Sequence, residues 1–355
     1  MEQDLSFIFN ELGEEREQYF NAVSPPIMQT SNFAFENISE MKMAFSDERK
    51  HSCYTRGKNP TVEILRKKVA ALENAEDALI VSSGCAAISL SVLSCLKTGD
   101  HVVFVNNPYS WTNKLMTVIL PRFGIAADAV DGTDPENYRK AMKPNTKIFF
   151  MESPNSYTFE LQDIEAICNI AKENNITTII DNSYATPLVQ KPIDLGCDIV
   201  VHSATKYFSG HSDVVVGIIA GSHKKIDEIF HNEFMTIGSI LSPNDAWLVI
   251  RGMRTMEIRM ERIIKTTEKI VDFLSNHPLV DTIFYPFYQK FPQYDLAKKQ
   301  MKSGTGLFSI KLKVDTLEQA EKFSNSLKRF LLAVSWGGYE SLIMPSCVFY
   351  DPNKN

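Results

Sequence analysis

Short apolar runs alternate with amphipathic stretches through the middle of the chain. Most of these runs are apolar without alternation, which is typical of strands buried on both faces. The helical patterns between them include residues 61–74, where Val62, Leu65, Val69 and Leu72 are spaced three or four apart. The order predicts a parallel sheet with helices as crossovers. The seven predicted strands are residues 78–81, 101–105, 125–130, 147–151, 176–180, 198–201 and 214–220.

The pattern changes after Pro243. Residues 244–277 read as one long helix bent near Gly252, followed by a strand-like run and a further helical stretch. The first 48 residues lack strong periodicity and are predicted to form an extended arm. We therefore predict three parts: an arm at residues 1–48, an α/β domain at 49–236, and a smaller α+β domain at 237–355.

Composition narrows the class of protein. The chain has 355 residues, 44% of them apolar, and a formal net charge of −6 with acids and bases interspersed. These values argue against a disordered chain and against nucleic-acid binding by bulk charge. The six cysteines form no C-x-x-C pair, and no signal peptide or membrane-spanning run is visible, so we expect a reduced, cytoplasmic protein. His202 and His211 show no metal-ligand spacing, and we expect packing or loop roles and no metal.

Polar residues gather where three predicted strands end, the edge at which open α/β sheets bind ligands. A helix start favours phosphate, and a carboxylate and a lysine at the same edge suggest pyridoxal phosphate, with the lysine forming a Schiff base. Each feature alone also has an ordinary explanation, as a helix cap, a turn former or a solvated lysine. The residues concerned are Ser82, Ser83 and Gly84, then Asp181, then Ser203, Thr205 and Lys206.

Four segments resemble one known family. Residues 54–89, 181–221, 238–263 and 333–346 are similar to the Cys/Met-metabolism family of pyridoxal-phosphate enzymes, which holds cystathionine γ-synthases, cystathionine β- and γ-lyases and methionine γ-lyases. The resemblance implies the α/β architecture of fold-type I pyridoxal-phosphate enzymes, with a mostly parallel seven-stranded sheet between helices and a smaller α+β C-terminal domain. It also implies a sulfur amino acid as substrate and a homo-oligomer, a dimer of dimers.

The resemblance assigns roles around the cofactor. Lys206 corresponds to the Schiff-base lysine and Asp181 to the carboxylate that keeps the ring nitrogen protonated. Ser203 and Thr205 correspond to phosphate contacts. Once the substrate amine has displaced it, Lys206 acts as general base at Cα and then returns a proton.

The resemblance also assigns a phosphate loop and a stacking ring. Ser83, Gly84 and Cys85 match the loop, although methionine is usual where Cys85 stands. The backbone makes that contact, so we expect the change to be tolerated. Tyr109 matches the tyrosine that stacks on the cofactor ring.

Further matches place the site between two subunits. Tyr54 and Arg56 match a pair donated to the phosphate of the neighbouring subunit, for which the planar guanidinium is suited. Ser335 and Trp336 are expected to border the substrate. Either Tyr54 or Tyr109 is a candidate proton carrier, and a purely packing or stacking role for each stays open.

The reaction type is predicted from short motifs. "SWGGYESL" from Ser335 and "ESPNSYTF" with Ser156 resemble the β-lyase branch, whereas "YTRGKNPT" resembles the γ branch. Val334 stands where γ-synthases and cystathionine γ-lyases often have Glu, although methionine γ-lyases lack that Glu too. We therefore predict that the chain most resembles cystathionine β-lyase within the family, and that it catalyses β-elimination of cystathionine, or of a related cysteine thioether, to a thiol, pyruvate and ammonia. Two alternatives stay open: γ-type chemistry, and a partner protein that binds the cofactor without catalysis.

One departure concerns the C-terminus. In the family, further residues follow this motif and carry an arginine that pairs with the substrate carboxylate, a strong bidentate contact. This chain ends at "FYDPNKN". We therefore expect either an incomplete C-terminal domain or a different group for the carboxylate.

Overall fold

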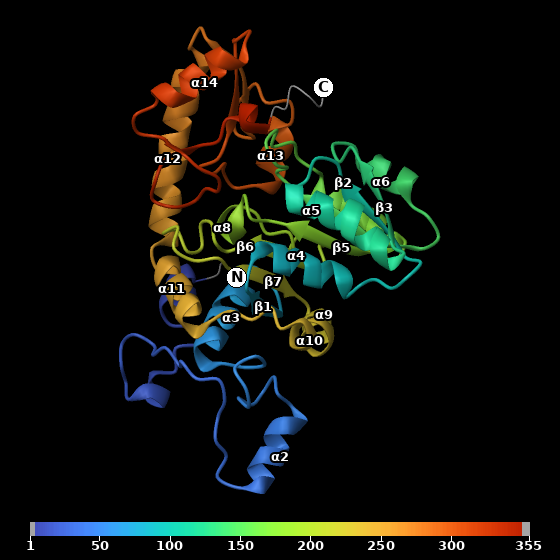
Figure 1. The fold of residues 1–355 in the computed structure, drawn as a ribbon, viewed down its shortest axis with the longest axis vertical. Helices are drawn as coiled ribbons and strands as arrows, with labels where there is room; N and C mark the ends of the chain where they lie inside the picture. The colour runs from blue at the N-terminus through green and yellow to red at the C-terminus, as the bar shows by residue number, and fades with distance from the viewer. Residues whose placement is uncertain (1–3, 350–355) are drawn as a thin grey trace.

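A seven-stranded sheet forms the centre of the protein (Figure 1). The structure is a computed structural model that describes residues 4–349. The strand order is β1-β7-β6-β5-β4-β2-β3, with β7 antiparallel to both neighbours and the other pairs parallel. This confirms the predicted mostly parallel sheet. The strands are β1 (Asp77–Val81), β2 (His101–Val105), β3 (Ala126–Val130), β4 (Thr146–Glu152), β5 (Thr177–Asp181), β6 (Ile199–Ser203) and β7 (Gly217–Gly221).

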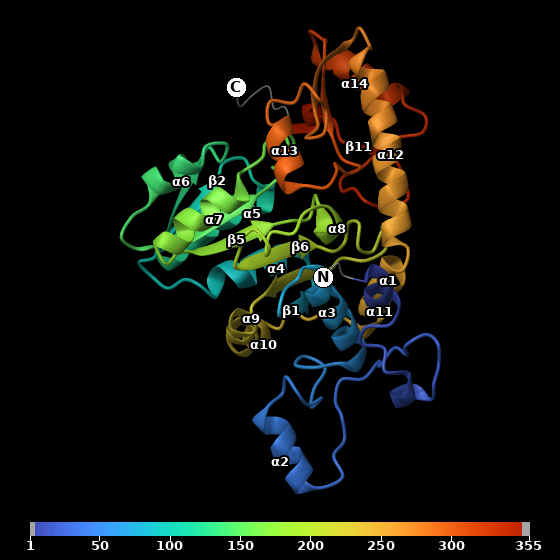
Figure 2. The same cartoon turned by 180° about the vertical axis from the view of Figure 1, so that it is seen from behind.

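Helices cover both faces of the sheet, as the two views show (Figures 1 and 2). Successive strand residues point to opposite faces, so Leu79 of β1 packs on the side of α4 (Gly84–Leu93) and Ile80 on the side of α3 (Pro60–Leu72). Burial on both sides explains why the strands show no polar alternation. The exception is β3, which lies at the sheet edge and is partly exposed.

The remaining helices of the α/β part are short. No helix among residues 4–349 is both long and apolar enough to cross a bilayer. The helix after β7 passes through a π-helical turn at residues 230–234, and another π-helical turn spans 115–119. These helices are α5 (Ser110–Lys114), α6 (Pro135–Ala141), α7 (Ile164–Glu173), α8 (Thr186–Val189), α9 (His223–Ile229) and α10 (Met235–Ile237).

The C-terminal part begins with two helices where we predicted one bent helix. The helix is interrupted at Arg254 and Thr255, just after Gly252. This interruption separates α11 (Pro243–Met253) from α12 (Met256–Ser275). Beyond them lie the antiparallel pair β8 (Val280–Phe284) and β9 (Ser309–Leu312), helices α13 (Tyr294–Gln300) and α14 (Leu317–Ser326), and the short parallel pair β10 (Leu331–Leu332) and β11 (Leu342–Ile343). The predicted domain boundaries stay predictions.

The N-terminal part is only partly extended. It contains α1 (Leu5–Asn10), a 3₁₀ turn at Arg16–Tyr19 and α2 (Ile38–Ser46), and α2 lies at the lower end of Figure 1, away from the sheet. An isolated bridge joins Asn32 to Tyr54. Apolar side chains such as Phe20 and Phe45 are exposed here.

A buried charge cluster fastens α1 to the body of the protein. The Lys68 ammonium donates to the carbonyls of Ile8 and Phe9 at 3.0 and 3.2 Å and lies 3.1 Å from a carboxylate oxygen of Glu14. Arg254 donates to the same carboxylate at 3.2 Å. Burial lowers the pKa of Lys68, so its charge depends on Glu14.

We expect Glu14→Ala to destabilise the protein strongly. The change leaves the Lys68 ammonium buried without its carboxylate, which typically costs about 3 to 5 kcal/mol. Glu15 pairs with Lys67 in an exposed site, so the control variant Glu15→Ala should lose no more than about 1 kcal/mol. Urea unfolding of the two variants measures the difference, and equal losses would contradict the assignment.

Candidate active site

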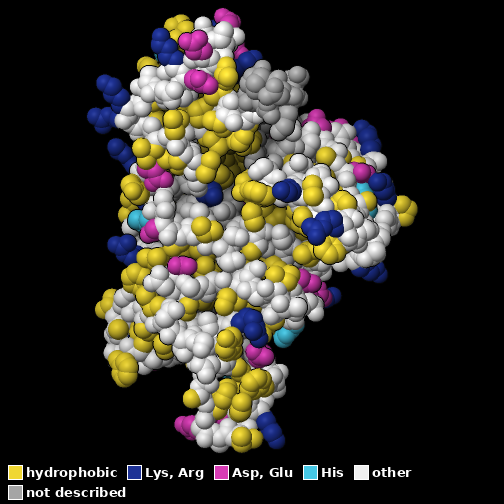
Figure 3. All heavy atoms as spheres, viewed as in Figure 1, with side chains coloured by type: hydrophobic (Ala, Val, Ile, Leu, Met, Phe, Trp, Pro, Cys, Tyr) yellow, Lys and Arg dark blue, Asp and Glu magenta, His cyan; other side chains and the backbone are white. Residues whose placement is uncertain are grey.

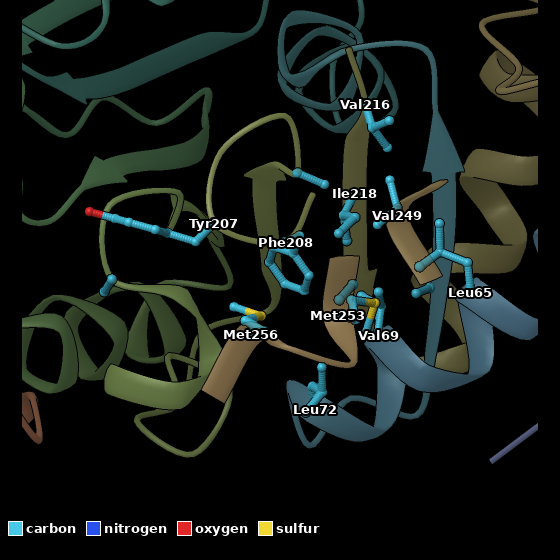
Figure 4. Close-up of a cluster of buried hydrophobic side chains, with 14 of the residues drawn as sticks. Leu65, Val69, Leu72, Tyr207, Phe208, Val216, Ile218, Val249, Met253 and Met256 are labelled. Atoms are coloured by element: carbon cyan, nitrogen blue, oxygen red, sulfur yellow. The ribbon is translucent and has the colours of Figure 1, made fainter. Parts of the chain in front are cut away.

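The position of Lys206 is set by the residues that follow it. Lys206 lies in a tight turn after β6, where its backbone N–H donates to the carbonyl of Ser203 at 3.1 Å. Tyr207 and Phe208 are both buried in the core formed with α3 and α11 (Figure 4). The Tyr207 hydroxyl also accepts from the backbone N–H of Gly306 at 2.9 Å. The core therefore holds the turn in place.

The Lys206 amine lies in a largely buried setting. It donates to the Ser203 hydroxyl at 3.4 Å and lies 4.7 Å from the centre of the Trp336 indole ring. Burial lowers the pKa of Lys206, while the charge of Asp181 opposes that shift. A lysine in such a setting has a larger neutral fraction, which is the nucleophilic and basic form.

The C-terminal part touches the turn that carries Lys206 through a close backbone contact. Gly337 has φ +84°, and a Cβ there would lie 2.9 Å from the carbonyl carbon of Lys206, so a larger residue would clash. The neighbouring Ser335 has φ 88° and is exposed, whereas Trp336 is partly buried. Figure 3 shows apolar side chains around a hollow between the C-terminal part and the α/β part.

Two carboxyl groups stand at neighbouring strand ends. Asp181 ends β5 and Glu152 ends β4, and the register pairs these two residues directly. Asp181 accepts from the backbone N–H of Ser183 at 2.9 Å, and its charge acts on Lys206. Asp181 therefore lies where the sequence predicted it, beside the lysine.

The start of α4 lies against the Lys206 turn. Ser83 caps the helix by accepting from the N–H of Ala86 at 3.0 Å, which leaves the N–H groups of Gly84 and Cys85 for another acceptor. A Cβ at Gly84 would lie only 2.8 Å from Cβ of Ser203, so glycine is needed for this approach. The helix start that was predicted to bind the phosphate is thus a direct neighbour of the turn that carries Lys206.

Tyr109 completes the group at the start of α5. Its backbone N–H donates to Glu152 Oε2 at 2.7 Å, and its side chain interacts with Cys85 and with the charge of Asp181. Burial raises the pKa of Tyr109 to about 12, so its phenol stays protonated at neutral pH. Burial also raises the pKa of the Cys85 thiol.

Three of the predicted residues are placed differently from this group. The Thr205 hydroxyl accepts from the N–H of Val216 at 3.0 Å, so the backbone before β7 already engages it. Tyr54 and Arg56 belong to the N-terminal part, with the guanidinium 5.3 Å from the centre of the tyrosine ring. The hydrogen bonds and ring contacts found among residues 4–349 connect neither of them to Lys206.

Sequence reasoning missed Glu152 and the buried partner of His202. Glu152 directly follows the apolar run 147–151, the same signal that drew attention to Asp181. His202 is a buried packing residue, as expected; its Nε2 bonds to Glu73 and its ring meets Phe208 edge-on. Within the described part of the chain, no group of three or more His, Cys, Asp or Glu is arranged to hold a metal.

Comparison with known families shows to which family the chain belongs. The model of the Cys/Met metabolism PLP-dependent enzyme family matches residues 8–350. The chain belongs to this family. It is a pyridoxal-phosphate-dependent carbon–sulfur lyase of sulfur amino-acid metabolism. The predicted family, cofactor and enzyme class are therefore confirmed.

Individual relatives refine the comparison. The chain is 41% identical over 337 residues to an L-methionine gamma-lyase of Treponema denticola, covering 94% of this chain and 84% of that protein. It is 36% identical to the cystathionine beta-lyase MetC of Bacillus subtilis, covering 91% and 80%. The crystal structure of metB from Corynebacterium glutamicum superposes with a TM-score of 0.90 at 36% identity, covering 96% of this chain and 86% of that chain.

These relatives correct one expectation. We predicted cystathionine β-lyase as the member that the chain resembles most, yet methionine γ-lyases match at higher identity. The β-type features lie in two short motifs, around Ser156 and Ser335, and do not extend to the whole chain.

The residues of this site fit pyridoxal phosphate. The N–H groups of Gly84 and Cys85 at the start of α4 suit a phosphate, the Asp181 carboxylate suits a protonated ring nitrogen, and the Lys206 amine suits the aldehyde. All of them lie at the carboxyl edge of the sheet or at the start of α4.

We expect Gly84→Ala to weaken pyridoxal-phosphate binding at least tenfold, because the added Cβ pushes the start of α4 away from Ser203. The matched variant Cys85→Ala should bind the cofactor as tightly as the wild type, since the backbone N–H makes that contact. Equilibrium titration of the apoenzyme with pyridoxal phosphate measures both affinities. A large loss in Cys85→Ala alone would contradict a backbone-held phosphate.

Proposed function

We propose that this protein catalyses γ-elimination of a methionine-like amino acid, releasing a thiol, 2-oxobutyrate and ammonia. The observation that carries the proposal is the 41% identity to proteins named L-methionine gamma-lyase, which extends over 94% of the chain. The arrangement around Lys206 supports it, because elimination requires a base next to the substrate's Cα.

The geometry of the site supports a set of cofactor contacts. The backbone N–H groups of Gly84 and Cys85, at the start of the helix that Ser83 caps, hold the phosphate together with the Ser203 hydroxyl. Asp181 faces the ring nitrogen and Lys206 forms the covalent link. When bound, pyridoxal phosphate supplies a ring that accepts the electron pair left at the substrate's Cα.

Two side chains carry the proton transfers in this proposal. Burial lowers the pKa of Lys206, so its amine can take the proton from Cα. After giving that proton up, the amine can take a second proton from Cβ, and the electron pair left at Cβ expels the thiolate from Cγ. Tyr109 keeps its phenol proton at neutral pH and can give it to the departing thiolate. A γ-elimination needs protons moved at both Cα and Cβ, which suits one mobile amine above both carbons.

The site is proposed to lie between two copies of the chain. Tyr54 bridges to Asn32 of the N-terminal arm and lies against the Arg56 guanidinium, and the hydrogen bonds and ring contacts found among residues 4–349 connect neither Tyr54 nor Arg56 to Lys206. Exposed apolar side chains of the same part, such as Phe20 and Phe45, support burial against a second copy. We propose that Arg56 reaches the phosphate held by the partner chain, in a dimer that pairs into a tetramer.

A second candidate is β-elimination of cystathionine. It is favoured by the two short motifs around Ser156 and Ser335. In the structure Ser156 donates to Glu152 beneath Tyr109, and Trp336 lies over the Lys206 amine. Both motifs therefore border the reacting groups.

Product analysis separates the two reactions. We expect 2-oxobutyrate from methionine with kcat/KM at least about tenfold above that for pyruvate from cystathionine, a transition-state difference of about 1.4 kcal/mol. Assay of both keto acids with purified protein and added pyridoxal phosphate measures the ratio. Pyruvate as the dominant product would overturn γ-elimination in favour of the second candidate.

Mixing two inactive variants tests the shared site. Lys206→Ala should lose both covalent cofactor attachment and turnover, and Arg56→Ala should lose most cofactor affinity. In a two-fold dimer of one copy of each, one of the two sites has both residues intact, so the purified mixed dimer should have about half of wild-type activity. Co-expression with two affinity tags supplies the mixed dimer. No recovery would show that each chain builds its site alone.

A further inference from the structure

Glu152 is a buried carboxyl group that the proposed reaction does not use. It is 6% exposed, and the ion pairs found among residues 4–349 include none at this residue. An ionised carboxylate buried without a cation is costly, because it loses its hydration and gains no opposite charge. Such a group calls for an explanation.

The Glu152 carboxyl joins two loops that border the site. One oxygen accepts from the backbone N–H of Tyr109 at 2.7 Å, and the other lies 2.5 Å from the Ser156 hydroxyl, which donates to it. A second bond ties the same loops together, since the Asn155 amide donates to the carbonyl of Asn106 at 3.0 Å. Glu152 therefore fixes the position of the Tyr109 backbone, from which the Tyr109 side chain extends.

A second carboxyl group beside Glu152 affects whether Glu152 can carry a charge. The register pairs Glu152 with Asp181, so two carboxyl groups stand side by side at the strand ends. Like charges so close disfavour double ionisation. The charge of Asp181 acts on Lys206. Glu152 instead faces Asp181, Ser156 and the backbone of Tyr109, and Cys85 lies beyond Tyr109. Burial, and then the charge of Asp181, raise the pKa of Glu152 to about 8.

We propose that Glu152 is held as a neutral carboxylic acid that positions Tyr109 and Ser156 and leaves Asp181 as the single negative charge beside the cofactor's ring nitrogen. The proposal rests on the cofactor contacts proposed above for Asp181 and Tyr109. In the neutral acid, one oxygen accepts from Tyr109 and the other carries a proton that it donates to Ser156. The hydroxyl proton of Ser156 is then free to turn toward the site. Glu152 is a positioning residue in this scheme, because it acts through Tyr109 and Asp181.

A neutral acid has a close mimic in glutamine. The Glu152→Gln amide accepts with its oxygen and donates with its nitrogen, as the acid does. In the unfolded chain glutamate ionises near pH 4.3. Between that pH and about 8 the folded wild type must keep a proton that the unfolded chain releases, so its stability falls with pH relative to Glu152→Gln. An ionised Glu152 with a lowered pKa would not produce this loss.

Urea unfolding at pH 5.5, 6.5 and 7.5 with saturating pyridoxal phosphate tests the charge state. We expect the ratio of the folding equilibrium constants, Glu152→Gln over wild type, to rise about tenfold for each unit by which the pH is raised. This is the effect of the one proton that only the folded wild type has to retain. The control Glu321→Gln, at an exposed position of α14, should show no trend. A flat or falling ratio for Glu152→Gln overturns the neutral acid.

Cofactor affinity tests the positioning role without using catalysis. Glu152→Gln should bind pyridoxal phosphate within about threefold of the wild type, whereas Glu152→Leu, which leaves the Tyr109 N–H without an acceptor, should bind at least about tenfold more weakly. Wild-type affinity in Glu152→Leu overturns the positioning role, and a Glu152→Gln as weak as Glu152→Leu overturns the neutral acid. If borohydride trapping places the cofactor on another lysine, the proposed function fails, while the pH trend still reports on Glu152.

Discussion

The approach of α4 to the turn that follows β6 is the contact on which the whole site depends. It brings the N–H groups of Gly84 and Cys85, at the start of the helix, next to Ser203, three residues before Lys206. Only a residue without Cβ permits this distance. The core then holds both sides, through α4 on one face of the sheet and Tyr207 and Phe208 on the other. The proposed cofactor site therefore depends on the close contact between α4 and the turn after β6.

Most of the sheet was predictable because burial on both faces leaves a plain signal. All seven apolar runs form strands, since an unbroken apolar segment of this length has few other places in a folded protein. The direction of β7 was not predictable, because periodicity says nothing about which way a strand runs. A bend near Gly252 was predicted, but the full break at Arg254 and Thr255 was not, because α11 and α12 continue one amphipathic pattern.

The site was predicted unevenly, for physical reasons. Lys206, Asp181 and Gly84 could be found because strand ends and helix starts converge in any open α/β sheet. Glu152 escaped notice because its meaning lies in its neighbours, Asp181 and Tyr109, which are distant in sequence. The two short motifs favoured β-elimination, whereas the relatives along the whole chain support the γ-type alternative better, because a few residues carry less information than identity over the full length.

The reversal of β7 has a mechanical consequence for the lysine. Because β7 runs back against β6, the segment between them leaves and re-enters the sheet at the same edge, and residues 204–216 never cross to the far side. The backbone on either side of Lys206 is therefore held by the sheet, through β6 before it and β7 after it. In the proposed reaction only the flexible four-carbon side chain of Lys206 would have to move, so its amine would stay close to the substrate throughout.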